Sequence, residues 1–172
     1  YSLCPVLFGS SEIAYNVFES FRGGETAKIF GRVLATVRHL FGSRSFAIDP
    51  YQLGHGNHEG IASGAFWFYA KQGFRPVDPD VTSLLEAELG QIAKKKGHRS
   101  SPATLERLAR AYVLWPAGRK EVLGVLSVSR VSRRVSAMLA ERFGADRARA
   151  ERACAAEARA RLGVAPAELR RW

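Results

Sequence analysis

Ser63-Gly-Ala-Phe-Trp-Phe-Tyr-Ala-Lys-Gln-Gly-Phe74 is the stretch on which the fold of this chain depends. Five of its first seven residues are apolar or aromatic, which is typical of a buried helix. Gly73 stands where the end of a helix prefers glycine, so we expect a helix that carries Tyr69 and Lys71 near its C-terminus. A tight turn and a short strand over residues 74–77 are then expected to follow.

Length and composition are those of a globular protein. The 172 residues suffice for one domain, or for one domain with a helical appendage, and an apolar content of 47% supplies a core. No apolar run approaches the roughly 20 residues that span a bilayer, so we expect no membrane insertion. Cys4 and Cys154 are expected to be unpaired thiols of a cytoplasmic protein. The chain starts at Tyr1 and its only methionine is Met138, which indicates an internal fragment or a trimmed chain.

The net charge of +10 is spread unevenly along the chain. Residues 1–97 contain 10 basic and 9 acidic residues, whereas residues 98–172 contain 16 and 7. The basic character therefore belongs to the C-terminal part. Its arginines alternate with glutamates at helical spacing and lack interleaved aromatic residues, which favours a solvated helical face over a nucleic-acid-binding surface.

Hydrophobic periodicity predicts an α/β unit in the N-terminal part. Alternating apolar residues indicate strands, and an apolar stripe with helical spacing closes at Gly42. The order strand, turn, helix, strand, loop, helix, strand favours a three-layer unit with parallel pairing across the crossover. The predicted elements are an edge strand at 1–10, a strand at 12–20, a turn at 21–26, a helix from 25 to 42, a strand at 44–48 and a loop at 51–57.

Beyond Pro79 the pattern becomes helical. Helix caps and apolar stripes predict helices over 81–96, 101–115, 127–143 and 146–162, and a short terminal helix after Pro166. We therefore divide the chain into an α/β unit at 1–79 and a basic, mainly helical region at 80–172.

The turn before the first long helix is a candidate phosphate-binding site. Unpaired backbone amides at a helix N-terminus favour an anion, and glycines let a ligand approach the backbone closely. An ordinary turn at the start of a helix is the alternative. The candidate binding residues are Arg22, Gly23, Gly24, Glu25, Thr26 and Ala27.

The glycine-bearing loop His55-Gly-Asn57, followed by His58, carries polar side chains. A zinc site is not favoured, because a third nearby histidine or cysteine is missing. We expect His55 and Asn57 to line a substrate cleft instead.

The spacing Ala65-x-x-Phe68-Tyr69-x-Lys71-x-Gly73-Phe74 resembles a signature of the GNAT superfamily of N-acetyltransferases. Arg22 and Ala27 also match the ends of that family's pyrophosphate loop, Gln/Arg-x-x-Gly-x-Gly/Ala. The resemblance covers roughly residues 12–78. Two positions depart from it: Glu25 replaces the middle glycine of the loop, and Ala62 stands where the family has asparagine.

The resemblance implies a fold and a reaction. The fold would be a GNAT-like mixed sheet flanked by helices, incomplete at its N-terminal side and followed by the mainly helical region. The activity would be direct transfer of an acyl group from acetyl-CoA, or another acyl-CoA, to an amine, with no metal. Tyr69 would be the general acid, Glu19 the base, and the turn at 22–27 would hold the pyrophosphate.

Two other readings of the sequence stay open. The chain is alternatively a non-catalytic GNAT-like interaction module, which Glu25, Ala62 and the short N-terminal part favour. An open sheet edge would then promote association with a partner or with itself. A basic helical nucleic-acid binder supported by an α/β unit rests on charge alone.

Overall fold

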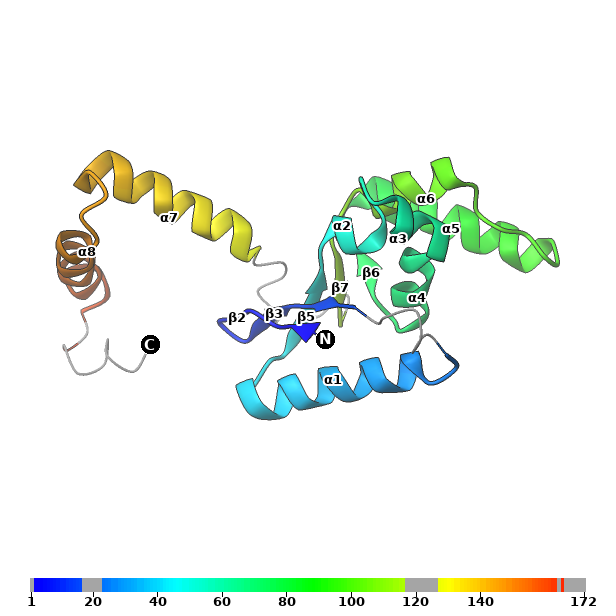
Figure 1. Cartoon of the computed structure of the whole chain (residues 1–172), viewed down its shortest axis with the longest axis horizontal. Coiled ribbons are helices and arrows are strands. Elements are labelled where there is room, and N and C mark those ends of the chain that lie inside the picture. Colours follow the sequence, from blue (N-terminus) through cyan, green and yellow to red (C-terminus); the bar gives the residue numbers. More distant parts are fainter. Residues whose placement is uncertain (1, 17–22, 117–126, 164, 166–172) are drawn as a thin grey trace. The chain divides into compact units, whose positions relative to one another are not determined.

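The computed structural model describes residues 2–16, 23–116, 127–163 and 165. The chain divides into two compact units, Tyr1–Leu126 and Ser127–Trp172, and each is treated by itself below. The first unit is an α/β structure whose small mixed sheet is flanked by helices, as the sequence predicted. The described part of the second unit is helical (Figure 1).

Within the described residues, the sheet of the first unit has five strands in the order β2-β3-β5-β7-β6. β3 and β5 are parallel, which confirms the predicted pairing across the helical crossover, and the other neighbours are antiparallel. β1 pairs with β4 and extends the hairpin of β2 and β3. The strands are β1 (Ser2–Leu3), β2 (Val6–Leu7), β3 (Ser10–Glu12), β4 (Ala14–Tyr15), β5 (Ser45–Ile48), β6 (Arg75–Pro76) and β7 (Val113–Trp115).

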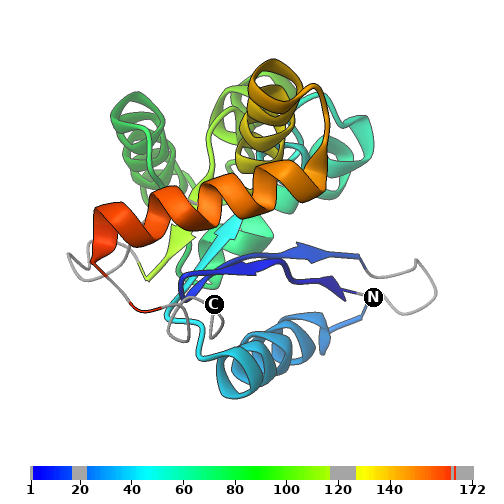
Figure 2. The same cartoon turned by 90° about the vertical axis from the view of Figure 1, so that its left-hand side faces the viewer.

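Helices cover both sides of this sheet. α1 forms the crossover between β4 and β5 and lies on one side, while α2, α3, α5 and α6 lie on the other (Figures 1 and 2). No helix within the described ranges combines the length and the apolar character needed to cross a lipid bilayer. The helices of the first unit are α1 (Thr26–Phe41), α2 (Pro50–Leu53), α3 (His58–Ser63), α4 (Ala65–Lys71), α5 (Pro79–Lys94) and α6 (Pro102–Ala109).

Phe30 of α1 occupies the centre of the core and is fully buried. Its ring centroid lies 5.1 Å from that of Tyr15 on β4, and 5.5 Å from those of Phe68 and Tyr69 on α4. Phe74, which follows α4, completes the cluster at 5.9 Å. Aromatic pairs of this kind contribute roughly 0.5–1.5 kcal/mol each beyond their buried area. The cluster therefore fixes α4 against α1 and the end of β4.

The aromatic stretch that predicts a buried helix is broken at one point. Gly64 adopts the left-handed conformation with φ 67°, so α3 ends at Ser63 and α4 starts at Ala65. The end of α4 is as predicted, with Lys71 in its last turn and Gly73 at φ 91°.

Several predicted boundaries are wrong. The predicted edge strand at 1–10 is divided into β1, β2 and the start of β3, and the described part of the strand predicted over 12–20 contains the end of β3 and the separate strand β4. The loop at 51–57 begins with the short helix α2, because the Asp49 side chain accepts a hydrogen bond from the Tyr51 amide and Pro50 occupies the first helical position. The helix predicted over 101–115 ends at Ala109, and Val113–Trp115 instead forms β7 between β5 and β6. Val113 is β-branched and Trp115 is aromatic, and both residue types are common in strands.

Because β7 lies inside the sheet, the first compact unit extends to residue 126 rather than to the predicted boundary at residue 79. α5 and α6 belong to this unit as well. α5 confirms the helix predicted over 81–96 to within two residues at each end.

The second unit contains α7 (Val128–Phe143) and α8 (Arg147–Leu162). Both helices and their caps agree with the prediction: Ser127 and Asp146 accept hydrogen bonds from backbone amides at the helix starts, and Gly144 and Gly163 end the helices. The short helix predicted after Pro166 falls outside the described residues.

Candidate functional site

A cavity of about 400 Å³ lies at the carboxyl ends of β4 and β5. In α/β sheets this is the edge at which ligands bind, because the loops and helix N-termini that follow the strands gather there. We call it the first cavity. Its lining is contributed by the end of β4 (Tyr15, Asn16), the start of α1 (Thr26), α2 (Tyr51, Gln52), α3 with its cap (Asn57, Glu59, Gly60, Ser63) and α4 (Ala65, Phe68, Tyr69).

Tyr69, the predicted general acid, lines the first cavity from α4 and is only 3% exposed. Among the described residues, none is hydrogen-bonded to its hydroxyl group. Burial raises the pKa of Tyr69 well above its ordinary value, and nearby Tyr15 raises it further. Tyr69 therefore stays protonated at neutral pH and presents a hydrogen-bond donor to the cavity.

Tyr15 accompanies Tyr69 at the cavity. Its hydroxyl is buried without a hydrogen-bond partner among the described residues, and burial raises its pKa. Buried polar groups are normally paired, so the Tyr15 hydroxyl at the wall of this cavity is unusual. The alternation over residues 12–20 predicts a strand that includes Tyr15, but it does not reveal that the strand ends at a cavity.

The glycine turn at the start of α1 borders the first cavity through Thr26. The Thr26 hydroxyl donates to the Gly23 carbonyl at 2.8 Å and accepts from the Gly23 amide at 3.3 Å, which closes the turn. A Cβ atom placed on Gly24 would meet no atom of the described residues within 4 Å, so the described structure leaves the backbone there open to a ligand. Arg22 lies outside the described residues.

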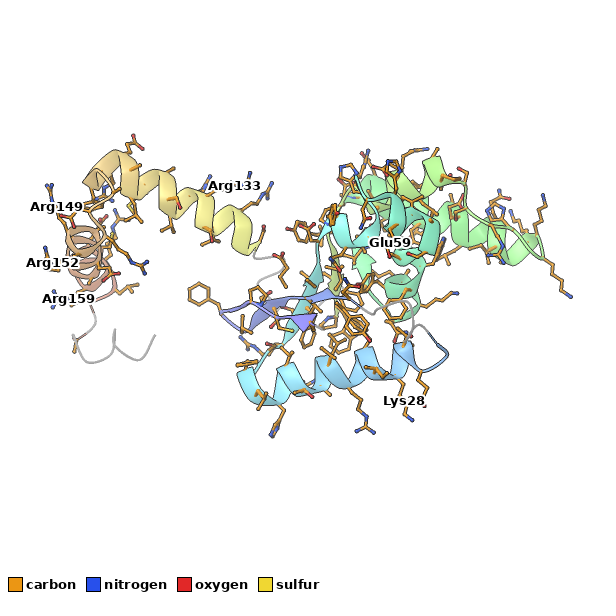
Figure 3. The ribbon with its side chains drawn as sticks, viewed as in Figure 1. Lys28, Glu59, Arg133, Arg149, Arg152 and Arg159 are labelled. Carbon is orange, nitrogen blue, oxygen red and sulfur yellow. The ribbon has the colours of Figure 1, made fainter. Side chains whose placement is uncertain are left out.

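Glu25, which departs from the family's loop pattern, precedes α1 without capping it. Its carboxylate lies 3.9 Å from the Lys28 ammonium group, and the two side chains are 80% and 72% exposed. Lys28 lies on the side of α1 away from the sheet (Figure 3). Glu25 is thus paired at the surface, and Ala27 lies in the first turn of the helix.

α3 brings an amide and a carboxylate to the first cavity. The Asn57 side chain caps α3 by accepting from the Gly60 amide at 3.2 Å and donates to the Tyr51 carbonyl at 3.1 Å. Glu59 follows in the first turn of α3 (Figure 3). Sequence reasoning did not single out Glu59, although an asparagine cap followed by a glutamate is a recognisable helix start.

His55 and Glu19 are not brought into this site by the described structure. His55 Nδ1 lies 3.0 Å from Glu106 Oε1, which also accepts from the Gly56 amide, and the His55 side chain is half exposed. This contact joins the loop to α6 and does not line the first cavity. Glu19 lies outside the described residues.

A second cavity of about 830 Å³ adjoins the first, and both are lined by Ser63 and Phe68. Its walls are largely apolar, with Trp67 on α4 and Leu89 and Ile92 on α5. Ala62 on α3 and Ala27 in the first turn of α1 also line the second cavity.

A hydrogen-bond chain runs along one side of the second cavity. Trp67 Nε1 donates to the Ser100 hydroxyl at 3.1 Å, which in turn donates to Glu88. His98 Nε2 lies 3.2 Å from the same carboxylate. The bond from Ser100 lowers the pKa of Glu88, burial opposes that shift, and His98 lowers the pKa further. The chain fixes the segment after α5 against α4.

Within the described ranges, no three His, Cys, Asp or Glu side chains lie close enough together to hold a metal ion. Asp49, which precedes the histidine loop in the sequence, caps α2 and accepts a hydrogen bond from the Tyr112 hydroxyl at 2.7 Å. No protein-family model, curated protein or solved structure matches this chain.

Proposed function

We propose that the first unit binds an acyl-CoA in the two cavities and transfers its acyl group to an amine. The observation that carries this proposal is the Tyr69 hydroxyl, which is protonated and without a described partner at a cavity on the carboxyl edge of the sheet, on a side chain that is only 3% exposed. A hydroxyl that has no protein partner and faces a cavity is available to a ligand, which gives a reason for its retention. Its position near the end of α4 is that of the tyrosine in the GNAT-like signature.

The residues present fit such a ligand. The amides at the start of α1 and the open backbone at Gly24 suit a pyrophosphate. Because Glu25 is paired with Lys28 at the surface, its carboxylate does not have to face that anion. The ligand is elongated, and two cavities that share Ser63 and Phe68 provide room for an elongated molecule.

A thioester supplies an activated acyl group and a thiolate leaving group. In this proposal the amine nitrogen attacks the carbonyl carbon, the carbon–sulfur bond breaks, and Tyr69 donates its proton to the departing sulfur. The raised pKa of Tyr69 does not forbid this transfer, because the same apolar surroundings disfavour a thiolate. Solvent then returns a proton to Tyr69.

Glu59 is the described carboxylate best placed to take the proton that the amine loses. It lines the first cavity from α3, whose capped start holds it at the cavity edge. Glu19 was predicted for this role from the sequence. Mutation of each carboxylate tests which of them is the base. If Glu59 is the base, Glu59→Gln lowers kcat and Glu19→Gln leaves kcat unchanged.

The test is the release of free thiol from acetyl-CoA in the presence of a panel of primary amines. We expect amine-dependent release, and a roughly 100-fold lower kcat for Tyr69→Phe with acetyl-CoA affinity nearly unchanged. Tyr51→Phe makes the same change at an exposed position of the same cavity and is the control, with activity close to that of the wild-type protein. Equal activity of the Tyr69→Phe and wild-type proteins would refute the assigned acid.

A further inference from the structure

α8, the second helix of the second unit, carries three arginines on one face. Arg149, Arg152 and Arg159 project from the side of α8 that points away from α7 (Figure 3). The opposite side packs in the unit, with Ala150 only 1% exposed and Cys154 partly buried. We call the three residues the α8 arginine face.

The acidic residues of α8 and of its cap are engaged elsewhere. Asp146 accepts from the Arg149 amide as the helix cap, and both glutamates of α8 pair with other arginines. Within the described ranges, no carboxylate lies within ion-pair distance of the α8 arginine face. Arg159 Nε donates to the Ala155 carbonyl of its own helix at 3.4 Å, which leaves its charge uncompensated. The glutamate pairs are Arg147–Glu151 at 2.8 Å, Arg161–Glu157 at 2.9 Å and Arg142–Glu157 at 3.3 Å.

The rest of the chain does not supply a compensating charge. Residues 127–172 contain 11 basic and 5 acidic residues, a net charge of +6, and residues 1–126 contain 15 and 11, a net charge of +4. Both parts are positively charged, so a strongly anionic partner from outside the chain is the natural complement.

The unit has the form of a helix-turn-helix. Only residues 144–146 separate α7 from α8, and the two helices cross at a wide angle in both views (Figures 1 and 2). Gly144 and Ala145 hold the turn with φ 56° and φ 66°, and their amides bond back to Ala140 and Leu139. Such a turn presents the second helix outward, as a helix that enters the major groove of DNA requires.

The side chains on the outer surface of α8 favour double-stranded DNA over single-stranded nucleic acid and duplex RNA. Arg149 and Arg159 lie about 15 Å apart along the axis at 1.5 Å per residue, which suits phosphates on the two walls of a groove about 12 Å wide. Alanines at 148, 155 and 156 are the small neighbours of the arginines and allow close approach. α8 has no aromatic residue on which unpaired bases could stack, and the narrow major groove of duplex RNA does not admit a helix.

We propose that the second unit binds the phosphate backbone of double-stranded DNA, with α8 in the major groove and the α8 arginine face on the phosphates. The partner is B-form duplex, recognised mainly by charge and groove shape.

The test uses the full chain and the fluorescence anisotropy of a short labelled DNA duplex, titrated between about 50 and 200 mM salt. The first variant neutralises the α8 arginine face by the triple substitution Arg149→Gln/Arg152→Gln/Arg159→Gln. Arg142→Gln/Arg147→Gln/Arg161→Gln is the matched control, because it removes the same charge from the ion-paired positions. Arg149→Lys/Arg152→Lys/Arg159→Lys keeps the charge and tests for rescue. Circular dichroism checks that α8 stays folded in each variant.

Three lost phosphate contacts should lower the slope of log affinity against log salt by about 2.7, so wild-type affinity falls roughly 40-fold more over that range than that of the glutamine variant. The control should keep most of the wild-type slope, and the lysine variant should restore it. Equal loss in the face variant and the control would overturn the proposal. Tighter binding to duplex RNA or to anionic vesicles than to DNA would overturn it as well.

Discussion

Removing the Tyr69 hydroxyl should stabilise the protein. The side chain is 3% exposed, and no described residue is hydrogen-bonded to its hydroxyl, which lines the first cavity. Leaving such a group unsatisfied costs about 1–3 kcal/mol. The Phe side chain keeps the ring that packs on Phe30, Phe68 and Phe74 at centroid distances of 5.5, 5.1 and 6.0 Å. Tyr69→Phe therefore removes the free-energy cost of the unsatisfied hydroxyl without creating a cavity in the core.

We expect Tyr69→Phe to raise the free energy of unfolding by about 1 kcal/mol, taken from the low end of that range because the cavity admits water. For a unit of this size, the rise corresponds to roughly 3–5 °C in Tm. The assay is thermal unfolding followed by circular dichroism, with a urea titration as an independent measure of the free energy.

Tyr112→Phe is the matched comparison, because it makes the same change where the hydroxyl is used. Tyr112 donates to the Asp49 carboxylate at 2.7 Å, and a hydrogen bond to a charged group contributes about 1.5–3 kcal/mol. This variant should be destabilised. If Tyr69→Phe were destabilised as much as Tyr112→Phe, the Tyr69 hydroxyl would be a satisfied structural group, and the reasoning that assigns it to a ligand would be refuted.

Further substitutions test the packing and the electrostatics. Phe30→Ala should cost about 3–5 kcal/mol, since it empties the centre of the aromatic cluster, and a urea midpoint close to that of the wild-type protein would contradict the described core. Gly60→Ala should destabilise the protein, because the added Cβ would lie 2.8 Å from the Gly54 Cα. At Gly90 in α5 an added Cβ meets no described atom within 4 Å, so Gly90→Ala should stabilise the protein by about 0.5–1 kcal/mol. The urea midpoints of the two variants should therefore shift in opposite directions. Because the pKa of Glu88 is lowered on folding, its stabilising contribution is present above the ordinary glutamate pKa and is lost as the pH falls through the folded value. The deficit of Glu88→Gln in urea unfolding should thus shrink as the pH falls below the ordinary glutamate pKa, and a deficit independent of pH would contradict the described hydrogen bonds of Glu88.

The elements that could be predicted from sequence are those with a long apolar stripe and a clear cap. α1 and α7 follow this rule, since Gly42 and Gly144 end them in left-handed conformations and their bounds agree with the prediction. The strand at 113–115 could not be predicted, because three residues are too few for a period. Its partners β5 and β6 are distant in sequence, so only tertiary pairing identifies it.

The candidate site divides in the same way. Tyr69 was predicted because a local motif places it near a helix end, and in the structure it lines the first cavity. Tyr15 and Glu59 were missed because they reach the cavity only through the order of the strands and the course of the loop after β5. Glu25 departs from the phosphate-loop pattern in sequence, but its partner Lys28 one turn later shows where its charge is balanced. An ion pair of this kind depends on helix geometry that a loop pattern does not encode.

The measurement that tests the central claim most directly is a calorimetric titration of acetyl-CoA into the wild-type protein, Gly24→Glu and Gly31→Glu. Both variants add one negative charge at a glycine where a Cβ meets no atom within 4 Å, but only Gly24 lies in the turn before α1. We predict micromolar binding by the wild-type protein, at least roughly tenfold weaker binding by Gly24→Glu, and unchanged binding by Gly31→Glu. No binding at millimolar acetyl-CoA, or equal weakening in the two variants, would contradict an acyl-CoA site at the start of α1.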